Sequence, residues 1–156
     1  MKKYSVIYCD PPWQFKTYSP KGKERKSPEL HYKTMTIEDI YNLPVNQIAD
    51  ENCVLFLWVT NPLLKEGLKT IESWGFTYKT VGFSWYKQNK ISDTFFWGLG
   101  YWSRANVELL LLATKGKPQR VSNGFSNRYM RNRNYLCCDN RTWILWGTYE
   151  IQCRVS

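Results

Sequence analysis

Residues 4–13 read Tyr-Ser-Val-Ile-Tyr-Cys-Asp-Pro-Pro-Trp, and this stretch decides the fold class. The run from Tyr4 to Cys9 is β-rich and almost continuously apolar, which is typical of a buried strand in an α/β sheet. Asp10 ends the run, and two prolines and a tryptophan follow it at once. We therefore predict a strand that ends in an acid, two rigid rings and a large aromatic side chain, a combination that needs an explanation.

Hydrophobic patterns farther along the chain alternate between strands and helices. Strands are predicted over residues 53–60, 77–87 and 106–116. Helices are predicted over residues 36–44 and 61–75, the first beginning at the N-cap Thr36 and the second ending at Gly75. This alternation predicts an α/β fold with a mostly parallel sheet and flanking helices.

Polar side chains stand at the carboxyl ends of the predicted strands, where α/β sheets bind their ligands. These residues are Asp10, Thr60, Lys87 and Lys115. We therefore expect them near the ligand site.

The composition points to a nucleic-acid partner. The chain has 156 residues, a length that suggests one domain, and its net charge is +9. Such a charge favours a polyanion, although general solubility is an alternative explanation. The longest apolar run, residues 53–59, is far too short to cross a bilayer, and no secretory signal follows Met1.

The cysteines and the histidine do not indicate a metal site. Five cysteines and one histidine show no metal-ligand spacing. The odd number of cysteines, in a chain without a signal, favours reduced thiols and a cytoplasmic location.

The motif Asp10-Pro11-Pro12-Trp13 can bind a planar group that carries an amine. Residues before prolines are held extended and Pro11 has no N–H, so the carbonyl groups here keep fixed directions. The Asp10 carboxylate and a backbone carbonyl can accept both N–H bonds of an exocyclic amine, while Trp13 offers a flat face to a nucleobase. Methylation of such an amine needs orientation and charge stabilisation rather than a metal or a covalent nucleophile. The alternative is that Asp10 caps a turn and the prolines only end the strand.

Several stretches in one order resemble a known enzyme family. They are DPPW at 10–13, HYKTMTIEDI at 31–40, LFLWVTNP at 55–62, WGF at 74–76, WYK at 85–87, FFWGLGYWSRANVELLLLATKGKP at 95–118 and QR at 119–120. Over about residues 4–122 the sequence resembles the MT-A70 family of S-adenosylmethionine-dependent N6-adenine methyltransferases. The resemblance implies a Rossmann-like methyltransferase fold in a circularly permuted order, with the catalytic motif ahead of the cofactor motif.

The resemblance also implies roles for individual residues. Asp10 and Pro11 would bind the target amine, and Asp10 would also be next to S-adenosylmethionine. Pro12 and Trp13 would shape the adenine pocket and stack on the base. Tyr32 would sit in a gating loop over the base.

The segment before the last strand matches residues that line the substrate side in relatives, namely Trp102, Arg104 and Glu108. The residues themselves agree, because a loop with glycines, aromatic side chains and an arginine can stack on bases and contact phosphate. The alternatives are that residues 95–97 cover an edge of the core and that Glu108 is a surface group on its strand.

The composition changes near residue 122. Residues 1–122 contain 14 lysines and 3 arginines, whereas residues 123–156 contain no lysine and 5 arginines. The H-S-x-K-P segment and the later strand motif that hold S-adenosylmethionine in relatives are not found in this part. We therefore divide the chain into a catalytic core over residues 1–122 and an atypical tail over residues 123–156. A shifted reading frame is one hypothesis for this tail, and a basic arm for nucleic acid is another.

Three functions are open from the sequence. The first is methyl transfer to the N6 amine of adenine, with DNA favoured over RNA and a prokaryotic or phage source. The second is an impaired or truncated relative that binds nucleic acid without methylating it. The third is an aromatic-rich module for single strands, which leaves the position of Asp10 unexplained. Homo- or hetero-oligomers are open too, since the aromatic residues leave room for a partner surface.

Overall fold

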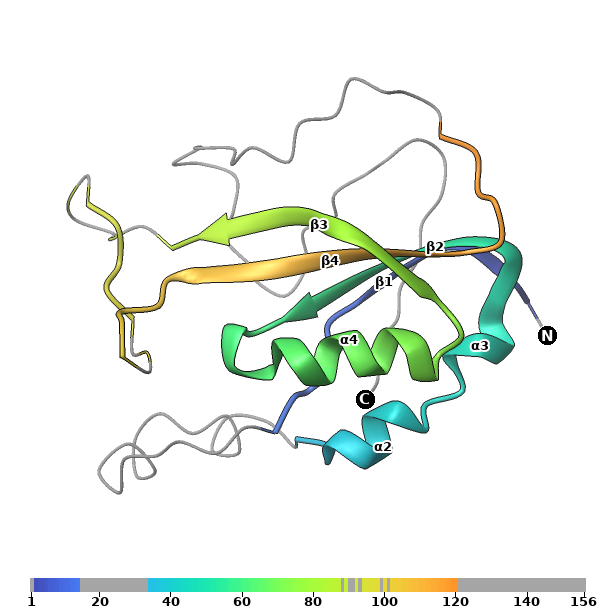
Figure 1. Cartoon of the computed structure of the whole chain (residues 1–156), viewed down its shortest axis with the longest axis horizontal. Coiled ribbons are helices and arrows are strands. Elements are labelled where there is room, and N and C mark those ends of the chain that lie inside the picture. Colours follow the sequence, from blue (N-terminus) through green and yellow to red (C-terminus); the bar gives the residue numbers. More distant parts are fainter. Residues whose placement is uncertain are drawn as a thin grey trace.

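The computed structural model describes residues 2–14, 34–87, 89, 92, 94–98, 100 and 102–120. Its elements are β1 (Tyr4–Cys9), α2 (Ile37–Tyr41), α3 (Val45–Ile48), β2 (Ala49–Val59), the 3-10 helix η2 (Asn61–Leu63), α4 (Leu64–Ser73), β3 (Thr77–Tyr86) and β4 (Val107–Lys115) (Figure 1). The four predicted strands and both predicted helical regions are present. Among the described residues, no helix has the length and apolarity that a membrane span requires. The predicted gating residue and the predicted tail fall outside this part of the chain.

The four strands form one sheet in the order β1-β2-β4-β3. β1 pairs with β2 in parallel, whereas β4 pairs antiparallel with both β2 and β3. β1, β2 and β3 therefore run in one direction, and β4 runs against them between β2 and β3. This corrects the prediction of a mostly parallel sheet for the described strands. The reason is that no helix lies between β3 and β4 in the described residues, so the chain turns back at the edge where β3 ended.

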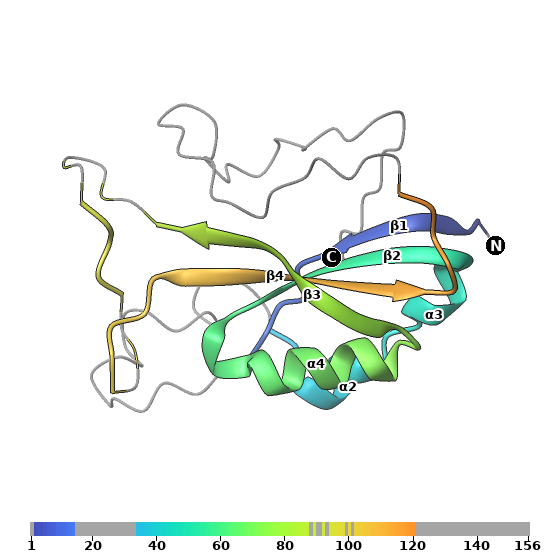
Figure 2. The ribbon, with the colours of Figure 1, turned by 45° about the horizontal axis from the view of Figure 1, so that its top comes forward.

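The helices α2, α3 and α4 lie on one face of the sheet (Figures 1 and 2). Side chains alternate along a strand, so one set of β2 residues faces the helices. Leu55, Leu57 and Val59 belong to this set and are at most 2% exposed. Ile71 of α4 is fully buried in the same hydrophobic cluster. The core therefore lies between this face of the sheet and the helices.

Two glycines and one indole fix α4 against the sheet. A Cβ atom at Gly67 would lie 2.8 Å from Val59 Cγ2, so the close approach of α4 to β2 requires glycine there. Gly75 has φ 78°, the left-handed conformation that turns the chain after a helix. The indole N–H of Trp74 donates to the Ile40 carbonyl oxygen at 2.9 Å and ties α4 to α2 inside the core.

The opposite face of the sheet carries more exposed side chains near the end of β1. Ile7 and Cys9 are buried on the helix side, whereas Tyr8 is 43% exposed and Asp10 continues this alternation with an exposed side chain. The Trp58 indole of β2 donates to the Tyr8 hydroxyl at 2.5 Å. The alternation therefore presents Asp10 to the side of the sheet away from the helices.

Candidate active site

Three strands end, and the fourth begins, at one edge of the sheet. β1 ends before Asp10, β2 before Thr60 and β3 before Lys87, and the reversed strand β4 begins there with Glu108 as its second residue. The strand ends therefore gather Asp10, Thr60 and Lys87 as predicted. Lys115 ends β4 at the opposite edge, so the expectation that it lies with the other three is wrong. Its position follows from the direction of β4.

The Asp-Pro-Pro-Trp motif is anchored on two sides. The indole N–H of Trp13 donates to the Trp58 carbonyl oxygen at 3.0 Å, and the Met35 N–H donates to the Pro12 carbonyl oxygen at 2.9 Å. Pro11 is buried, and Trp13 is only 5% exposed. The buried ring corrects the prediction that Trp13 offers an open face for stacking. The indole packs in the core and fixes the motif in position.

Two hydrogen-bond acceptors remain at the motif. The Asp10 side chain is exposed. The Pro11 carbonyl oxygen accepts one hydrogen bond, from the Trp13 N–H at 2.7 Å. Because a carbonyl oxygen has two lone pairs, Pro11 keeps the capacity for a second donor. Asp10 and Pro11 thus offer acceptors in adjacent residues, and their role in binding an amine stays a prediction.

The surroundings of Asp10 disfavour its charged form. Burial of the carboxyl group by the protein around it and, as the smaller cause, the charge of Glu108 together raise the pKa of Asp10 from 3.8 to about 6. The residue as a whole keeps an exposed surface, so protein crowds the carboxyl group and solvent still reaches it. A carboxyl group with a strongly raised pKa at the end of a strand is typical of a functional site.

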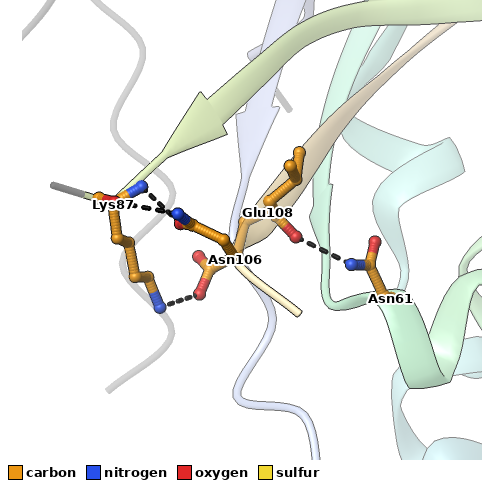
Figure 3. A network of polar contacts seen from close by, with 5 residues as sticks. Asn61, Lys87, Asn106 and Glu108 are labelled. Carbon is orange, nitrogen blue, oxygen red and sulfur yellow. Dashed lines mark hydrogen bonds and ion pairs between the residues drawn. The ribbon is translucent and has the colours of Figure 1, made fainter. Parts of the chain in front are cut away.

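A network of polar contacts joins the strand ends around the site (Figure 3). The Lys87 ammonium pairs with Glu108 Oε1 at 2.5 Å. The Lys87 N–H donates to Asn106 Oδ1 at 2.7 Å, and Asn106 Nδ2 donates to the Lys87 carbonyl oxygen at 2.9 Å. On the other side of β4, Asn61 Nδ2 donates to the Val107 carbonyl oxygen at 2.9 Å. The end of β3, the start of β4 and the residues after β2 are thereby held together.

Sequence reasoning missed the two asparagines of this network. Asn106 immediately precedes β4, and Asn61 lies just after β2. An asparagine beside a strand end can bond the neighbouring main chain with its side-chain amide. That position is the signal that could have identified both residues.

The segment between β3 and β4 exposes aromatic side chains. Phe95 is 54% exposed, Phe96 45%, Trp97 73% and Trp102 95%. These values do not fit the alternative in which residues 95–97 cover an edge of the core. The main chain at Trp102 has φ 68°, a conformation that is rare for a bulky residue. The segment leaves β3 and enters β4 at the edge that carries Asp10, and the Phe96 N–H donates to the Lys87 carbonyl oxygen at 2.9 Å. The exposed aromatic side chains therefore begin at this edge of the sheet.

Arg104 and Tyr32 are two further predicted substrate residues. Arg104 is exposed in the aromatic segment, in agreement with a surface role. Tyr32 lies outside the described residues, so its gating role stays a prediction.

The charges at this edge suit a cationic methyl donor such as S-adenosylmethionine, which carries a sulfonium group. Asp10 and Glu108 supply two carboxyl groups against the single ammonium of Lys87. Thr60 adds a buried hydroxyl oxygen for which the described part of the chain provides no hydrogen-bond partner. Within that same part, no cluster of histidine, cysteine and acidic residues could hold a metal ion. The residues present therefore fit this donor.

Comparisons with known proteins give a family and several relatives. A family model described as MT-A70 matches residues 4–143. The type II methyltransferase M.MunI of Mycoplasma sp is 32% identical over 130 residues, which cover 74% of this chain and 53% of M.MunI. The N(6)-adenosine-methyltransferase catalytic subunit METTL3 of Homo sapiens is 28% identical over 123 residues, which cover 78% of this chain and 19% of METTL3. The N6-adenosine-methyltransferase non-catalytic subunit MTB of Arabidopsis thaliana is 37% identical over 89 residues, which cover 56% of this chain and 11% of MTB. The chain thus spans about half the length of M.MunI and a smaller share of the other two.

Proposed function

Because the chain belongs to the MT-A70 family of N6-adenine methyltransferases, which use S-adenosylmethionine, we propose that it methylates the exocyclic N6 amine of adenine in nucleic acid. The observation that carries this proposal is the position of Asp10. Asp10 follows β1 at the edge where Thr60, Lys87 and Glu108 also lie, and as a whole residue it keeps an exposed surface. Ligands of α/β sheets bind beyond strand ends of this kind.

Asp10 acts in this proposal as an acceptor that orients the amine. The lone pair of an exocyclic amine is delocalised into the ring, so the nitrogen is a poor nucleophile. One N–H donated to the Asp10 carboxylate and the other donated to the Pro11 carbonyl hold the lone pair toward the methyl donor. S-adenosylmethionine supplies the methyl group from its sulfonium centre.

The same carboxyl group stabilises the charge that develops during transfer. The nitrogen becomes positive as it takes the methyl group, and the Asp10 carboxylate faces that charge at short range. The nitrogen then loses a proton. A carboxyl group with a pKa of about 6 can hold this proton until it reaches solvent.

The charge of the chain and its aromatic segment support nucleic acid as the substrate. The net charge of +9 favours a polyanion. Trp97 and Trp102 expose rings that can stack on unpaired bases, and Arg104 can contact phosphate. An adenine must leave its stack before its amine can reach Asp10, and exposed rings beside the site can hold the neighbouring bases.

We favour DNA over RNA as the polymer. The type II methyltransferase M.MunI shares more identity with the chain than the adenosine methyltransferase subunit METTL3 does, 32% against 28%. The chain also spans more of M.MunI, 53% against 19% of METTL3. Methyl transfer to single- and double-stranded DNA and RNA oligonucleotides of matched sequence separates the two substrates.

The second candidate function is binding of nucleic acid without methyl transfer. The non-catalytic subunit MTB is 37% identical to the chain over 89 residues. In addition, the tail of this chain lacks the two cofactor motifs that the resemblance leads us to expect. A protein of this kind binds nucleic acid and transfers no methyl group.

The test is binding of labelled S-adenosylmethionine by the full chain, followed by methyl transfer to adenine-containing DNA. The proposal expects saturable binding, transfer, and a loss of transfer of about 10²- to 10³-fold in Asp10→Ala, since one charge-stabilising acceptor contributes this much. Asp50→Ala is the matched control, because Asp50 is an exposed aspartate at the start of β2, on the opposite edge. Nucleic-acid binding without cofactor binding or transfer would overturn the proposal in favour of the non-catalytic candidate.

A further inference from the structure

Both the main chain and the side chain of Lys87, the residue that follows β3, make contacts with the beginning of β4. The Asn106 side chain bonds both the N–H and the carbonyl oxygen of Lys87, at 2.7 and 2.9 Å. The ammonium contacts Glu108 Oε1 at 2.5 Å and lies 5.2 Å from the centre of the Trp85 ring. Figure 3 shows the amide and the carboxylate on the same side of the β4 start, both directed at Lys87. The main chain and the charged end of Lys87 are therefore both fixed.

Glu108 connects this ion pair to Asp10. Its negative charge is a cause, second to burial, of the raised pKa of Asp10. A free carboxylate acts on its surroundings as a full charge. A carboxylate paired with an ammonium acts as a dipole, and the field of a dipole falls off more steeply with distance.

The charged groups around Asp10 come from two strands of the described part of the chain. Glu108 of β4 lies on the same side of the sheet as Asp10, because its neighbour Leu109 pairs with the helix-side Val59, and its charge acts on Asp10. Lys87, which follows β3, pairs with Glu108. The residues that follow β2, Thr60 and Asn61, are uncharged. Tyr8, two residues before Asp10 on β1, accepts a hydrogen bond from an indole. Glu108 is thus the residue through which Lys87 can influence the charge state of Asp10.

We propose that Lys87 is a positioning residue that acts on Asp10 through Glu108. By pairing with Glu108, Lys87 holds that carboxylate in one place and offsets its charge, so that Asp10 stays ionised beside it at neutral pH. An ionised Asp10 is the form that accepts a hydrogen bond from the adenine amine. The catalytic meaning of this inference rests on the proposed function, whereas the coupling itself can be measured without catalysis.

The test is a double-mutant cycle in which the titration of the Asp10 carboxyl carbon is followed by NMR. We expect Lys87→Met to raise the midpoint by about one pH unit, the size expected when one nearby charge loses its partner. Glu108→Gln should lower the midpoint, because it removes the charge that raises it. In the Glu108→Gln background, Lys87→Met should change nothing further, since Lys87 then has no carboxylate to act through.

Two further variants control for structural effects. Lys87→Arg keeps the positive charge and should preserve the wild-type midpoint. Lys79→Met removes an exposed lysine from β3, the strand that Lys87 follows, and should have no effect. Thermal unfolding of every variant checks that each is folded at the temperature of the titration.

The outcomes decide between the coupling and its alternatives. An unchanged midpoint in Lys87→Met would overturn the inference and leave Lys87 a structural role. An equal shift with and without Glu108 would also overturn it, because Lys87 would then act on Asp10 directly.

Methyl transfer by the same variants separates this inference from the proposed function. Where transfer occurs, the pH–rate midpoint of Lys87→Met should rise with the NMR midpoint while the KM for DNA stays unchanged. A raised KM with an unmoved midpoint would make Lys87 a phosphate contact and overturn the inference. Absence of transfer by the wild-type chain, with the NMR cycle as expected, would refute the proposed function alone.

Discussion

Replacing Asp10 with asparagine should stabilise the fold above about pH 6. The pKa of Asp10 is about 6 in the folded protein against an ordinary 3.8, because burial and then Glu108 disfavour its charged form. The folded state therefore binds this proton more tightly than the unfolded state does. The stability that the group contributes is fully present below pH 3.8 and is lost as the pH rises through about 6. Asparagine has no charge, so the variant avoids the loss.

The magnitude follows from the shift and from the exposure of the group. A shift of about two pH units corresponds to at most about 3 kcal/mol. Asp10 keeps an exposed surface, so solvent still screens its carboxyl group, which reduces the expected difference to about 1 kcal/mol. The assay is urea unfolding of both proteins at several pH values. The free energy of unfolding should differ little near about pH 4, and the variant should be more stable by about 1 kcal/mol near pH 8.

A charge-matched control and an activity measurement complete this prediction. Glu72→Gln removes an exposed charge from α4 and should not reproduce the pH-dependent gain. Methyl transfer by Asp10→Asn should fall about 10²- to 10³-fold, because the neutral amide stabilises the positive nitrogen poorly. A gain of equal size at both pH values would refute the reasoning, since it would come from packing rather than from charge. A variant less stable than the wild type near pH 8 would refute it as well.

Three further substitutions test the packing and the aromatic segment. Gly67→Ala should lower the free energy of unfolding by about 1–2 kcal/mol, because its Cβ would lie 2.8 Å from Val59 Cγ2. Adding Val59→Ala to the Gly67→Ala protein should restore part of the loss. An unchanged urea midpoint in Gly67→Ala would contradict the close approach of α4 to β2. Trp13→Phe removes the indole bond to β2 and should cost about 1–3 kcal/mol by the same assay, whereas a neutral effect would mean that the bond does not anchor the motif. Trp97→Ala should weaken binding of single-stranded DNA about 5- to 150-fold in fluorescence anisotropy, as the loss of one stacked base predicts, and full affinity would remove Trp97 from the interface.

The beginning of α2 and the end of α4 could be predicted, because each depends on residues that are neighbours in the sequence. The Thr36 hydroxyl accepts a hydrogen bond from the Asp39 N–H at 3.1 Å, as the predicted N-cap requires. Gly75 follows α4 with a positive φ, as the predicted terminator requires. The direction of β4 could not be predicted in this way, because parallel and antiparallel buried strands share the same apolar pattern. That direction depends on the connection from β3, and the error placed Lys115 at the wrong edge.

For the site, the sequence could predict the position of single residues along the chain but not the contacts between distant residues. Asp10 follows a buried apolar run, which is enough to locate it at a strand end. The buried indole of Trp13 donates a hydrogen bond to the carbonyl oxygen of Trp58, which is 45 residues away in the sequence. The clamp of Asn106 on Lys87 joins residues 19 positions apart. Contacts over such separations leave no periodic signal, so the sequence alone could not choose between a stacking tryptophan and an anchoring one. The division of the chain at residue 122 and its circularly permuted order stay predictions.

Because β4 runs back along the sheet, the composition of the connection from β3 to β4 can vary independently of the position of Asp10. The connection from β3 leaves and re-enters the sheet at one edge, so changes in its length or composition need not shift the register of any strand pair. In the proposed function, the surface that would contact the nucleic acid can therefore change while the carboxylate at the end of β1 stays where it is. Exchanging this connection between relatives that modify different polymers is consequently a direct way to redirect target choice on an unaltered catalytic frame.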